Sequence, residues 1–198
     1  MQTPKDEIRN NILAVAREEF SKNGFERASI RTITAKAKTS KSNVYNYFKD
    51  KDALFHAVVE PTLSGIREGF RQLREGNGAR SADSYTITAQ KEVIITFMTF
   101  VLSHGDDFKL LFFNSWGSSL SGFKGQLIDS LADILEDWVK TIAADKGLSR
   151  LFIRSVAGFY INTIEQLLLE DKTRELTAGN LDEFLRFVYG GWNNILKK

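Results

Sequence analysis

The chain has 198 residues, of which 42% are apolar, so it suits one or two domains with buried cores and is not expected to be disordered. It contains no cysteine, which excludes a disulfide framework, a thiolate metal site and a cysteine nucleophile. No N-terminal apolar run resembles a signal peptide and no apolar stretch reaches membrane-spanning length. We therefore expect a soluble, cytoplasmic protein without a membrane partner.

The positive charge is concentrated in one short region. The formal net charge is only +2, but residues 27–51 carry seven basic side chains and one acidic one. From residue 61 onward, 16 basic side chains stand against 17 acidic ones. This distribution is expected of a DNA-binding module joined to an electrically balanced domain. The basic residues of the module are Arg27, Arg31, Lys36, Lys38, Lys41, Lys49 and Lys51.

Residues 5–22 are predicted to form a helix, because apolar residues recur there every three or four positions. This apolar stripe consists of Ile8, Ile12, Leu13, Ala16 and Phe20. Gly24, at the C′ position, is expected to end the helix. The next residue, Phe25, is predicted to fill a small core that it shares with Phe20, Ile33, Val44 and Phe48.

Two short helices are predicted over residues 29–36 and 40–48. Ser29 is the expected N-cap of the first helix. Ser40 is the expected N-cap of the second helix, where its side chain can accept the backbone N–H of Asn43. Residues 37–39 form the connection. Two helices joined by such a turn make a helix-turn-helix, in which the second helix reads the DNA major groove.

The predicted recognition helix is apolar on one face and polar on the other. Val44 and Phe48 lie four positions apart, so they share a face and are assigned to the core. The polar face offers hydrogen-bonding side chains and a cation, which suit the base edges of the major groove. Tyr45 is expected to reach either a thymine methyl group or a phosphate. The predicted base contacts are Lys41, Ser42, Asn43, Tyr45 and Asn46.

Residues 25–55 resemble the N-terminal domain of the TetR family of bacterial transcriptional repressors. The matching residues are Gly24-Phe25, Ser29-Ile30-Arg31-Thr32-Ile33, Ser40-Lys41, Val44-Tyr45-Asn46-Tyr47-Phe48, Lys51 and Leu54-Phe55. The Tyr-x-Tyr-Phe-x-x-Lys run is the most specific of them. The family usually has glycine in the turn where this chain has Lys38, a position that implies a positive φ. The resemblance implies contacts to DNA phosphates, which set register, by Arg31, Ser40, Tyr47 and Lys51.

A longer helix is predicted over residues 50–74, and Pro61 is expected to kink or break it. Residues 76–84 form a loop by composition. We place the domain boundary inside this helix. Residues 1–52 then form the helix-turn-helix DNA-binding domain, and residues 53–198 form an effector-binding and dimerisation domain.

The rest of the chain shows helical periodicity and no strand-type alternation. A Ser/Gly-rich linker is predicted over residues 117–125. Together these elements predict an all-α fold of about nine helices. It has an N-terminal three-helix helix-turn-helix domain and a C-terminal helical ligand-binding and dimerisation domain. The further predicted helices span residues 85–103, 106–116, 124–144, 149–170 and 180–196.

The family resemblance implies an effector pocket enclosed by the helices of the middle of the chain. A mostly apolar lining with a few polar groups predicts a small, mostly apolar effector. His104, Asn114 and Gln126 are candidates to orient it, with a merely structural or exposed position as the alternative. For each aromatic residue the alternative is core packing. The predicted pocket residues are Phe97, Phe100, Val101, His104, Phe112, Phe113, Trp116 and Trp138.

The last two predicted helices carry broad apolar faces. The resemblance implies that they pair with a second copy across a two-fold axis, and a protein that reads two half-sites of a palindromic operator needs such a homodimer. The alternative is that each helix covers its own subunit. Gly190 and Gly191 would destabilise the last helix, which a close helix–helix approach or a kink would explain. The predicted interface residues are Phe159, Ile164, Leu167, Leu185, Val188 and Trp192.

We interpret the sequence as a ligand-responsive transcriptional regulator that binds double-stranded DNA, most consistent with a repressor that releases its operator when an effector binds. One alternative is a small-molecule-binding or enzymatic helical protein with a structural N-terminal module, and another is an architectural DNA-binding protein without an effector. We expect no enzymatic activity and no cofactor, because the carboxylate clusters at residues 106–107 and 133–137 are typical of solvated helix faces. His104 with Asp106 and Asp107 is too unspecific to predict a metal site.

Overall fold

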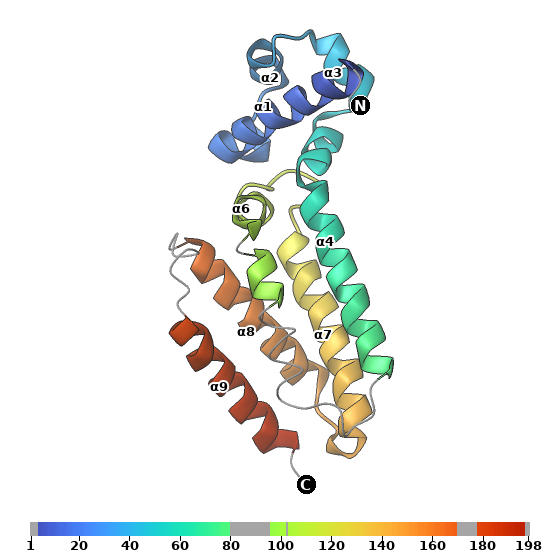
Figure 1. Ribbon diagram of the computed structural model, residues 1–198, viewed down its shortest axis with the longest axis vertical. Coiled ribbons are helices and arrows are strands. Elements are labelled where there is room, and N and C mark those ends of the chain that lie inside the picture. Colours follow the sequence, from blue (N-terminus) through green and yellow to red (C-terminus); the bar gives the residue numbers. More distant parts are fainter. Residues whose placement is uncertain (1–3, 80–95, 102, 170–177, 197–198) are drawn as a thin grey trace. The chain divides into compact units, whose positions relative to one another are not determined.

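The computed structural model describes residues 4–79, 96–101, 103–169 and 178–196. Throughout these ranges the regular structure is helical, as predicted (Figure 1). In the same ranges, no helix combines the length and the apolar character needed to cross a membrane. The helices are α1 (Pro4–Arg27), α2 (Ile30–Lys36), α3 (Lys41–Tyr47), α4 (Lys51–Ala79), α6 (Gly105–Phe113), α7 (Phe123–Ile142), the 3-10 helix η2 (Ala144–Lys146), α8 (Arg150–Leu169) and α9 (Ala178–Leu196).

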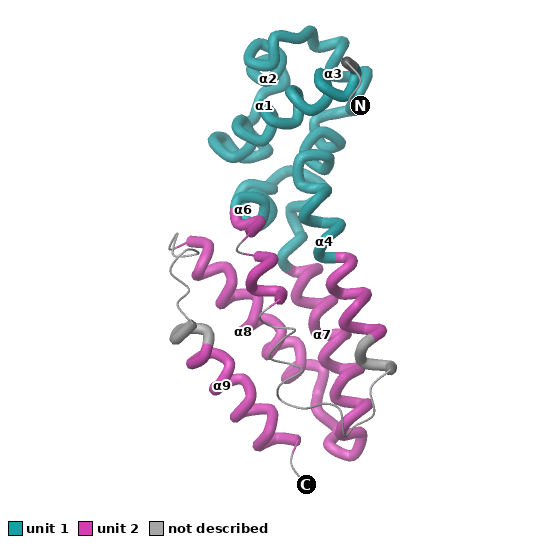
Figure 2. Tube along the Cα trace, viewed as in Figure 1, with its two compact units in different colours: residues 1–66, 106–124 teal, residues 67–105, 125–198 magenta. Residues whose placement is uncertain are grey.

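The chain divides into two compact units (Figure 2). Unit 1 comprises residues 1–66 and 106–124, and unit 2 comprises residues 67–105 and 125–198. Unit 1 therefore holds α1, α2, α3, the first part of α4 and nearly all of α6. The predicted functional division at residue 52 stays a prediction, and the compact units cut the chain at other places.

The first three helices of unit 1 and the start of α4 enclose the small core that the sequence pattern predicts. Its aromatic rings meet edge to face, with the ring centroid of Phe55 5.0 Å from that of Phe20 and 5.3 Å from that of Phe25. Gly24 interrupts α1 with φ 69° and ψ 165°, which confirms the predicted stop and uses a conformation that glycine adopts at little cost. Ile8, which we expected on the buried stripe, is 41% exposed. The buried residues are Ile12, Ala16, Phe20, Phe25, Ile33, Val44, Phe48, Leu54 and Phe55.

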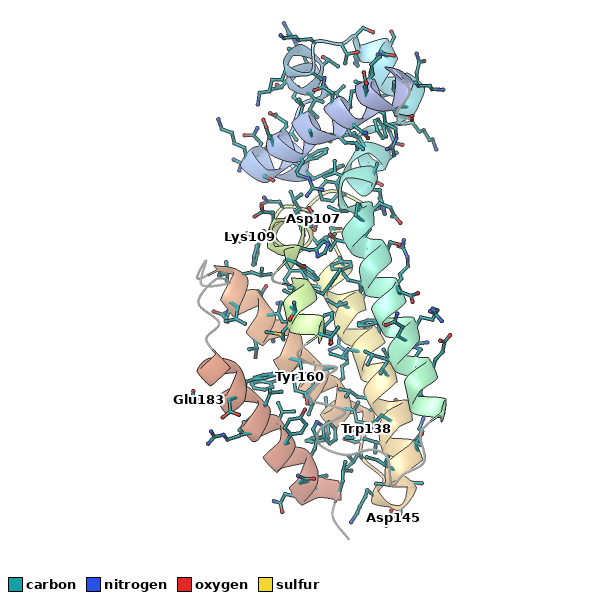
Figure 3. The ribbon with its side chains drawn as sticks, in the orientation of Figure 1. Asp107, Lys109, Trp138, Asp145, Tyr160 and Glu183 are labelled. Carbon is teal, nitrogen blue, oxygen red and sulfur yellow. The ribbon has the colours of Figure 1, made fainter. Side chains whose placement is uncertain are left out.

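Helices α7, α8 and α9 of unit 2 meet in an aromatic cluster. The indole rings of Trp138 and Trp192 stand edge to face with centroids 5.0 Å apart, and Phe152 lies 6.1 Å from Trp192. The indole N–H of Trp192 donates a 2.7 Å hydrogen bond to the hydroxyl of Tyr160 (Trp138 and Tyr160 are labelled in Figure 3). Burial raises the pKa of Tyr160 to about 12, so its hydroxyl stays neutral at physiological pH.

The polar contacts between α7 and α8 are exposed ion pairs. Arg150 at the start of α8 binds Asp133 at 2.6 Å and Glu136 at 2.8 Å, both on α7. One turn further on, Arg154 binds Asp129 at 2.6 Å. These pairs fix the relative register of two helices whose apolar sides pack together. Exposed pairs of this kind contribute only about 0–1 kcal/mol each.

Helix α4 continues through Pro61, so the predicted break does not occur. The helix also runs on to Ala79, which makes the start of the loop predicted at residue 76 wrong. The remainder of that loop and residues 85–95 of the next predicted helix lie outside the described residues. Residues 96–101 are helical, as predicted. Helix α6 ends at Phe113, three residues before its predicted end.

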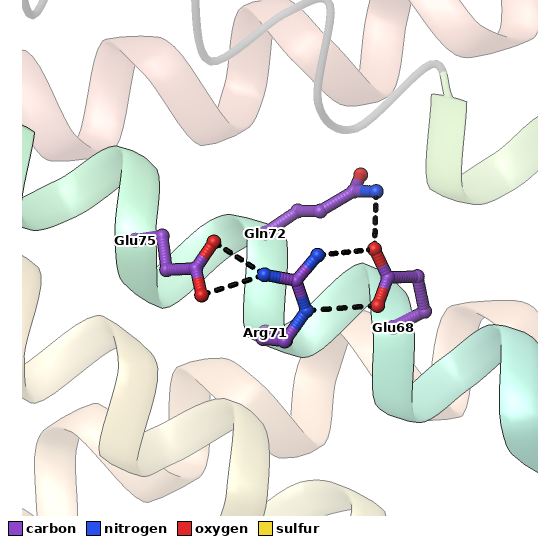
Figure 4. Close-up of polar contacts among 4 residues, drawn as sticks. All are labelled: Glu68, Arg71, Gln72 and Glu75. Carbon is purple, nitrogen blue, oxygen red and sulfur yellow. Dashed lines mark hydrogen bonds and ion pairs between the residues drawn. The ribbon is translucent and has the colours of Figure 1, made fainter.

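The part of α4 that belongs to unit 2 carries a chain of charged contacts along its surface (Figure 4). The guanidinium of Arg71 donates to Glu68 at 2.6 and 2.8 Å and to Glu75 at 2.6 Å. The side-chain amide of Gln72 also donates to Glu68, at 2.8 Å. Residues three or four apart share a helix face, so these pairs support the helix beyond Pro61. Hydrogen bonds from Arg71 and then Gln72 lower the pKa of Glu68 to about 2.

Candidate nucleic-acid interface

Helix α3 presents the two faces that the sequence predicts. Val44 is 1% exposed and Phe48, the C-cap residue of α3, is 4% exposed, so the apolar side of the helix is buried within unit 1. The hydroxyl of Ser40 accepts the backbone N–H of Asn43 at 3.0 Å, which confirms the predicted N-cap. The helix is too short to persist alone, so its position depends on this packing and on the cap.

The residues predicted to contact bases lie together on the other side of α3. Lys41, Ser42 and Asn46 are exposed, and Tyr45 is 43% exposed. The ammonium of Lys41 lies 5.7 Å from the centroid of the Tyr45 ring, within reach of a cation–π interaction. The side-chain amide of Asn43 donates to the hydroxyl of Thr39 at 2.8 Å, so its nitrogen is already engaged with the turn.

The turn between α2 and α3 takes the conformation that glycine would favour. Lys38 has a φ of 51°, which agrees with the positive φ implied at this position. The backbone N–H of Thr39 donates to the carbonyl of Thr34 at 3.0 Å, which closes the turn. The side-chain amide of Asn11 on α1 donates to the carbonyl of Ala37 at 2.9 Å, which fixes the turn against α1.

The backbone N–H at the N-terminus of α2 has a hydrogen-bond acceptor that the sequence did not suggest. Ser29 is the N-cap residue of α2, as predicted, and has extended backbone, but its side chain makes no capping hydrogen bond. A carboxylate oxygen of Glu19 instead accepts the backbone N–H of Ser29 at 3.4 Å. Glu19 is 3% exposed and is paired with Lys36 at 3.5 Å, which gives its charge a partner.

The residues predicted to contact phosphates differ in their exposure and in the contacts that they already make. Arg31 and Ser40 are exposed, and Tyr47 is half-buried against Phe48. Lys51 is engaged inside unit 1. Its ammonium donates to the carbonyls of residues 25, 26 and 28 at 2.8, 3.1 and 3.3 Å, and it lies 4.5 Å from the ring centroid of Phe25.

The segment after α6 is hydrogen-bonded to the helix-turn-helix at two places that sequence patterns did not reveal. The carbonyl of Asn114 accepts the backbone N–H of Phe25 at 2.7 Å, and its side-chain amide donates to the carbonyl of Ser21 at 3.0 Å. Periodicity reports which residues share a helix face, but it carries no signal for such contacts, made 89 and 93 positions apart. This is why residues 106–124 belong to unit 1.

The second place lies at the start of α4. The carboxylate of Asp52 accepts both the backbone N–H of Ser119 at 2.8 Å and its hydroxyl at 2.7 Å. The ring Nε2 of His56 lies 2.8 Å from the same hydroxyl. Burial by itself would raise the pKa of Asp52, but the hydrogen bonds from Ser119 and the nearby His56 outweigh it and hold that pKa below its usual value.

The predicted pocket residues do not fall into one unit. Phe97, Phe100, Val101, His104 and Trp138 belong to unit 2, whereas Phe112, Phe113 and Trp116 belong to unit 1. The rings of Phe100 and His104 lie 4.3 Å apart, and Val101 is buried. Trp138 instead belongs to the aromatic cluster with Trp192. Phe113 is 37% and Trp116 72% exposed, and the pocket assignment stays a prediction.

Most of the predicted interface residues are buried within the single chain. These are Ile164, Leu185, Val188 and Trp192, whereas Leu167 is half-buried and Phe159 is 42% exposed. An exposed apolar residue outside the predicted set is Phe187 of α9, which is 69% exposed and whose ring centroid lies 5.6 Å from that of Phe159. A Cβ placed on Gly190 or Gly191 would meet nothing within 4 Å, so no element of the described chain requires glycine there.

Comparison with known proteins agrees with this arrangement. The family model described as "Bacterial regulatory proteins, tetR family" matches residues 12–58, which cover the helix-turn-helix. The HTH-type transcriptional regulator UidR of Escherichia coli (strain K12) is 37% identical over 76 residues, or 38% of this chain and 39% of that protein. The helix-turn-helix part of the chain is therefore similar to that of the TetR family. The chain spans about two fifths of the length of UidR.

Two solved structures extend the likeness in fold to the C-terminal part of the chain. A TetR-like transcriptional regulator from Rhodococcus sp. RHA1 covers 100% of both chains with a TM-score of 0.64 and 20% identity. The regulator FadR from Bacillus subtilis, solved in complex with stearoyl-CoA, covers 89% of this chain and 96% of its own, with a TM-score of 0.56 and 18% identity. At these identities the likeness shows a shared fold.

Proposed function

We propose that the chain is a DNA-binding transcriptional regulator whose helix α3 enters the major groove. The observation that carries this proposal is the exposed polar side of α3, held in place by its buried reverse side, within the most basic part of the chain. Base edges are read by Lys41, Ser42, Asn43, Tyr45 and Asn46. Phosphates are bound by Arg31, Ser40, Tyr47 and Lys51, the last of which must exchange carbonyl partners for a phosphate.

A salt titration of duplex binding tests this proposal. A duplex would be selected with the purified protein from a random-sequence pool, and its binding followed by fluorescence anisotropy. We expect the logarithm of affinity to fall linearly with the logarithm of salt concentration, with a slope of about −0.9 per phosphate contacted. If no duplex is selected, or if the affinity does not depend on salt, the result favours the alternative of a helical protein whose N-terminal module is merely structural.

Asn43→Ala tests the assignment of base contacts. We expect it to change the preferred base at one position of the selected duplex, at a cost of about 1–3 kcal/mol for the original base pair. Because Asn43 also binds Thr39, the control is Thr39→Val, which removes that hydrogen bond but keeps the amide. If Asn43→Ala and Thr39→Val alter binding equally and leave base preference intact, Asn43 acts only on the turn.

We further propose a homodimer formed through α8 and α9, which suits a palindromic operator. Support comes from the paired, exposed rings of Phe159 and Phe187 and from the open surface at Gly190 and Gly191, where a partner helix would approach closely. Ile164, Leu185, Val188 and Trp192 serve mainly as the core beneath this surface, because their side chains are buried within one chain.

Phe187→Asp should therefore yield monomers, because it places a charge at the centre of the proposed interface. The mass in solution, measured by light scattering, would show it. Leu151→Asp is a matched control, since Leu151 is 78% exposed and lies in the first turn of α8. A dimer that survives Phe187→Asp at micromolar concentration would require a different interface.

The proposed effector is a small, mostly apolar molecule bound in the C-terminal domain, whose binding releases the operator. Its support is the aromatic and aliphatic group of Phe97, Phe100 and Val101 beside His104, together with the stearoyl-CoA bound by the FadR neighbour. Thermal melts against fatty acids, acyl-CoAs and aromatic acids would find such a ligand, since a ligand of the native state raises the melting temperature. A compound that raises this temperature without weakening DNA binding would not be the effector proposed.

A further inference from the structure

The turn between α2 and α3 carries a lysine in the left-handed region of backbone conformation. Lys38 has a φ of 51°, and in the described part of the chain it is the only non-glycine residue with a positive φ. This conformation brings the Cβ of an L-residue close to the carbonyl oxygen that follows, a contact that glycine avoids. A lysine at this position therefore makes the turn less stable than a glycine would.

Hydrogen bonds on both sides hold Lys38 in this conformation. The backbone N–H groups of residues 37, 38 and 39 donate to carbonyls within α2, at 2.9, 3.3 and 3.0 Å. The carbonyl of Ala37 accepts the side-chain amide of Asn11 on α1 at 2.9 Å, and the hydroxyl of Thr39 accepts that of Asn43 on α3 at 2.8 Å. Lys38 cannot leave the left-handed region without breaking bonds that position α3.

The side chain of Lys38 has no partner within the fold that would offset this loss of stability. It is exposed, and it forms no hydrogen bond, ion pair or ring contact with the residues that the structure describes. Two other lysines of the same basic region differ from it, because Lys36 pairs with Glu19 and Lys51 donates to three carbonyls. The ammonium of Lys38 is therefore available to a partner outside the chain.

The position of Lys38 along the chain indicates what that partner is. It lies two positions before Ser40, the N-cap of α3, and so next to the end of the proposed recognition helix that carries Lys41 and Ser42. In a helix-turn-helix this end of the second helix contacts base edges, and backbone phosphates border the groove. The flexible stem of a lysine carries a compact charge that binds a phosphate without requiring a fixed geometry.

We propose that Lys38 is a further DNA contact, whose ammonium binds a backbone phosphate at the edge of the groove that α3 enters. Stability that the turn loses through its left-handed lysine is thus exchanged for affinity. Because a phosphate contact carries no sequence information, Lys38 strengthens binding to all duplexes alike and leaves base preference unchanged. This inference rests on the proposed DNA-binding function and adds to it a contact made from the turn itself.

Lys38→Gly should change stability and DNA affinity in opposite directions. Glycine relieves the backbone of the turn, so the melting temperature, followed by circular dichroism, should rise by about 1–4 °C. Affinity for the duplex selected by the parent chain, measured by fluorescence anisotropy, should fall about three- to tenfold. The slope of the logarithm of affinity against the logarithm of salt concentration should become less steep by about 0.9, because one phosphate contact is lost.

Three further variants separate the charge from the backbone. Lys38→Arg keeps the positive charge and the strained turn, so its affinity, salt slope and melting temperature should match those of the parent chain. Lys38→Asn removes the charge but keeps a residue that tolerates a positive φ, so it should lose DNA affinity as Lys38→Gly does. Lys22→Gln removes an exposed charge from α1 in the same unit, and as the control for net charge it should leave the salt slope unchanged.

Equal affinities and salt slopes in the parent chain, Lys38→Gly and Lys38→Asn would overturn the phosphate contact while leaving DNA binding by α3 intact. The contact would also be overturned if Lys38→Arg lost as much affinity as Lys38→Gly, or if Lys22→Gln reduced the salt slope equally. Turn geometry or net charge would then explain the losses. If the parent chain itself binds no duplex, the proposed function fails, and the contact of Lys38 fails with it.

Discussion

The polar contacts inside unit 1 differ in kind from those inside unit 2. In unit 1 the contacts join residues far apart in sequence and end on backbone groups or buried side chains, such as Lys51 on the carbonyls at the end of α1 or Arg17 on Asp107. In unit 2 they are mostly exposed ion pairs, such as Arg71 with Glu68 along one helix and Arg150 with Asp133 between neighbouring helices.

This difference matches what each unit is proposed to do. A recognition helix must be held at a fixed position, and buried long-range contacts have few alternative arrangements. A unit that binds a ligand gains from packing that can adjust, and aromatic clusters with exposed ion pairs permit that. The family model matches residues 12–58, all within unit 1, so the constrained unit is also the one that sequence comparison detects.

The largest effect that would test this comparison is expected from Phe55→Ala in unit 1. Phe55 is fully buried and contacts the rings of Phe20 and Phe25, so its loss should lower the free energy of unfolding by about 3–5 kcal/mol. Guanidinium denaturation would measure it. Leu151→Ala in unit 2, at a 78% exposed position, should change stability by less than about 0.5 kcal/mol. Equal losses would remove the contrast between the buried and exposed positions.

An intermediate effect is expected from Lys51→Met, which keeps the aliphatic stem and removes the ammonium. Three carbonyls lose a charged donor, so we expect a loss of about 1–3 kcal/mol in the free energy of unfolding. The neighbouring exposed Lys49→Met should leave stability unchanged. Stability retained in Lys51→Met, with a salt slope of DNA binding reduced by about one, would assign Lys51 to phosphate binding alone.

The smallest effect is expected from Glu68→Gln in unit 2, and it depends on pH. Because its folded pKa is lowered from 4.5 to about 2, Glu68 contributes stability above pH 4.5 that is lost as the pH falls toward 2. The variant should therefore match the parent chain near pH 2 and be slightly less stable at pH 7, as thermal melts would show. Glu183→Gln, at an exposed position of α9, is the control. A difference that is the same at both pH values would exclude the ionised pair as its cause.

Much of unit 1 could be predicted from local sequence. The period of the apolar residues located α1, and the serine cap with Val44 and Phe48 located α3 and its buried side. These features are set by residues within a few positions of one another, which is the range over which periodicity and capping rules operate.

The features that were not predicted depend on contacts over long sequence distances. Nothing near Asp107 indicates that α6 joins the helix-turn-helix unit, because its partners Thr62 and Arg17 lie 45 and 90 positions earlier. The interface residues were chosen by helical period, which cannot distinguish a face buried against its own subunit from one left exposed. Phe187 was not chosen for that reason, since it lies next to the buried stripe of α9 and not within it.

The three tryptophans of the chain occupy contrasting surroundings, and this gives the molecule its own optical reporters. Trp116 in unit 1 is 72% exposed, whereas Trp138 and Trp192 of unit 2 are 6% and 7% exposed. Indole emission moves to longer wavelengths in water, so the blue part of the spectrum reports on the C-terminal interior and iodide quenching reports on Trp116. Melting of the C-terminal half can thus be followed in the unmodified protein, without dyes or labels.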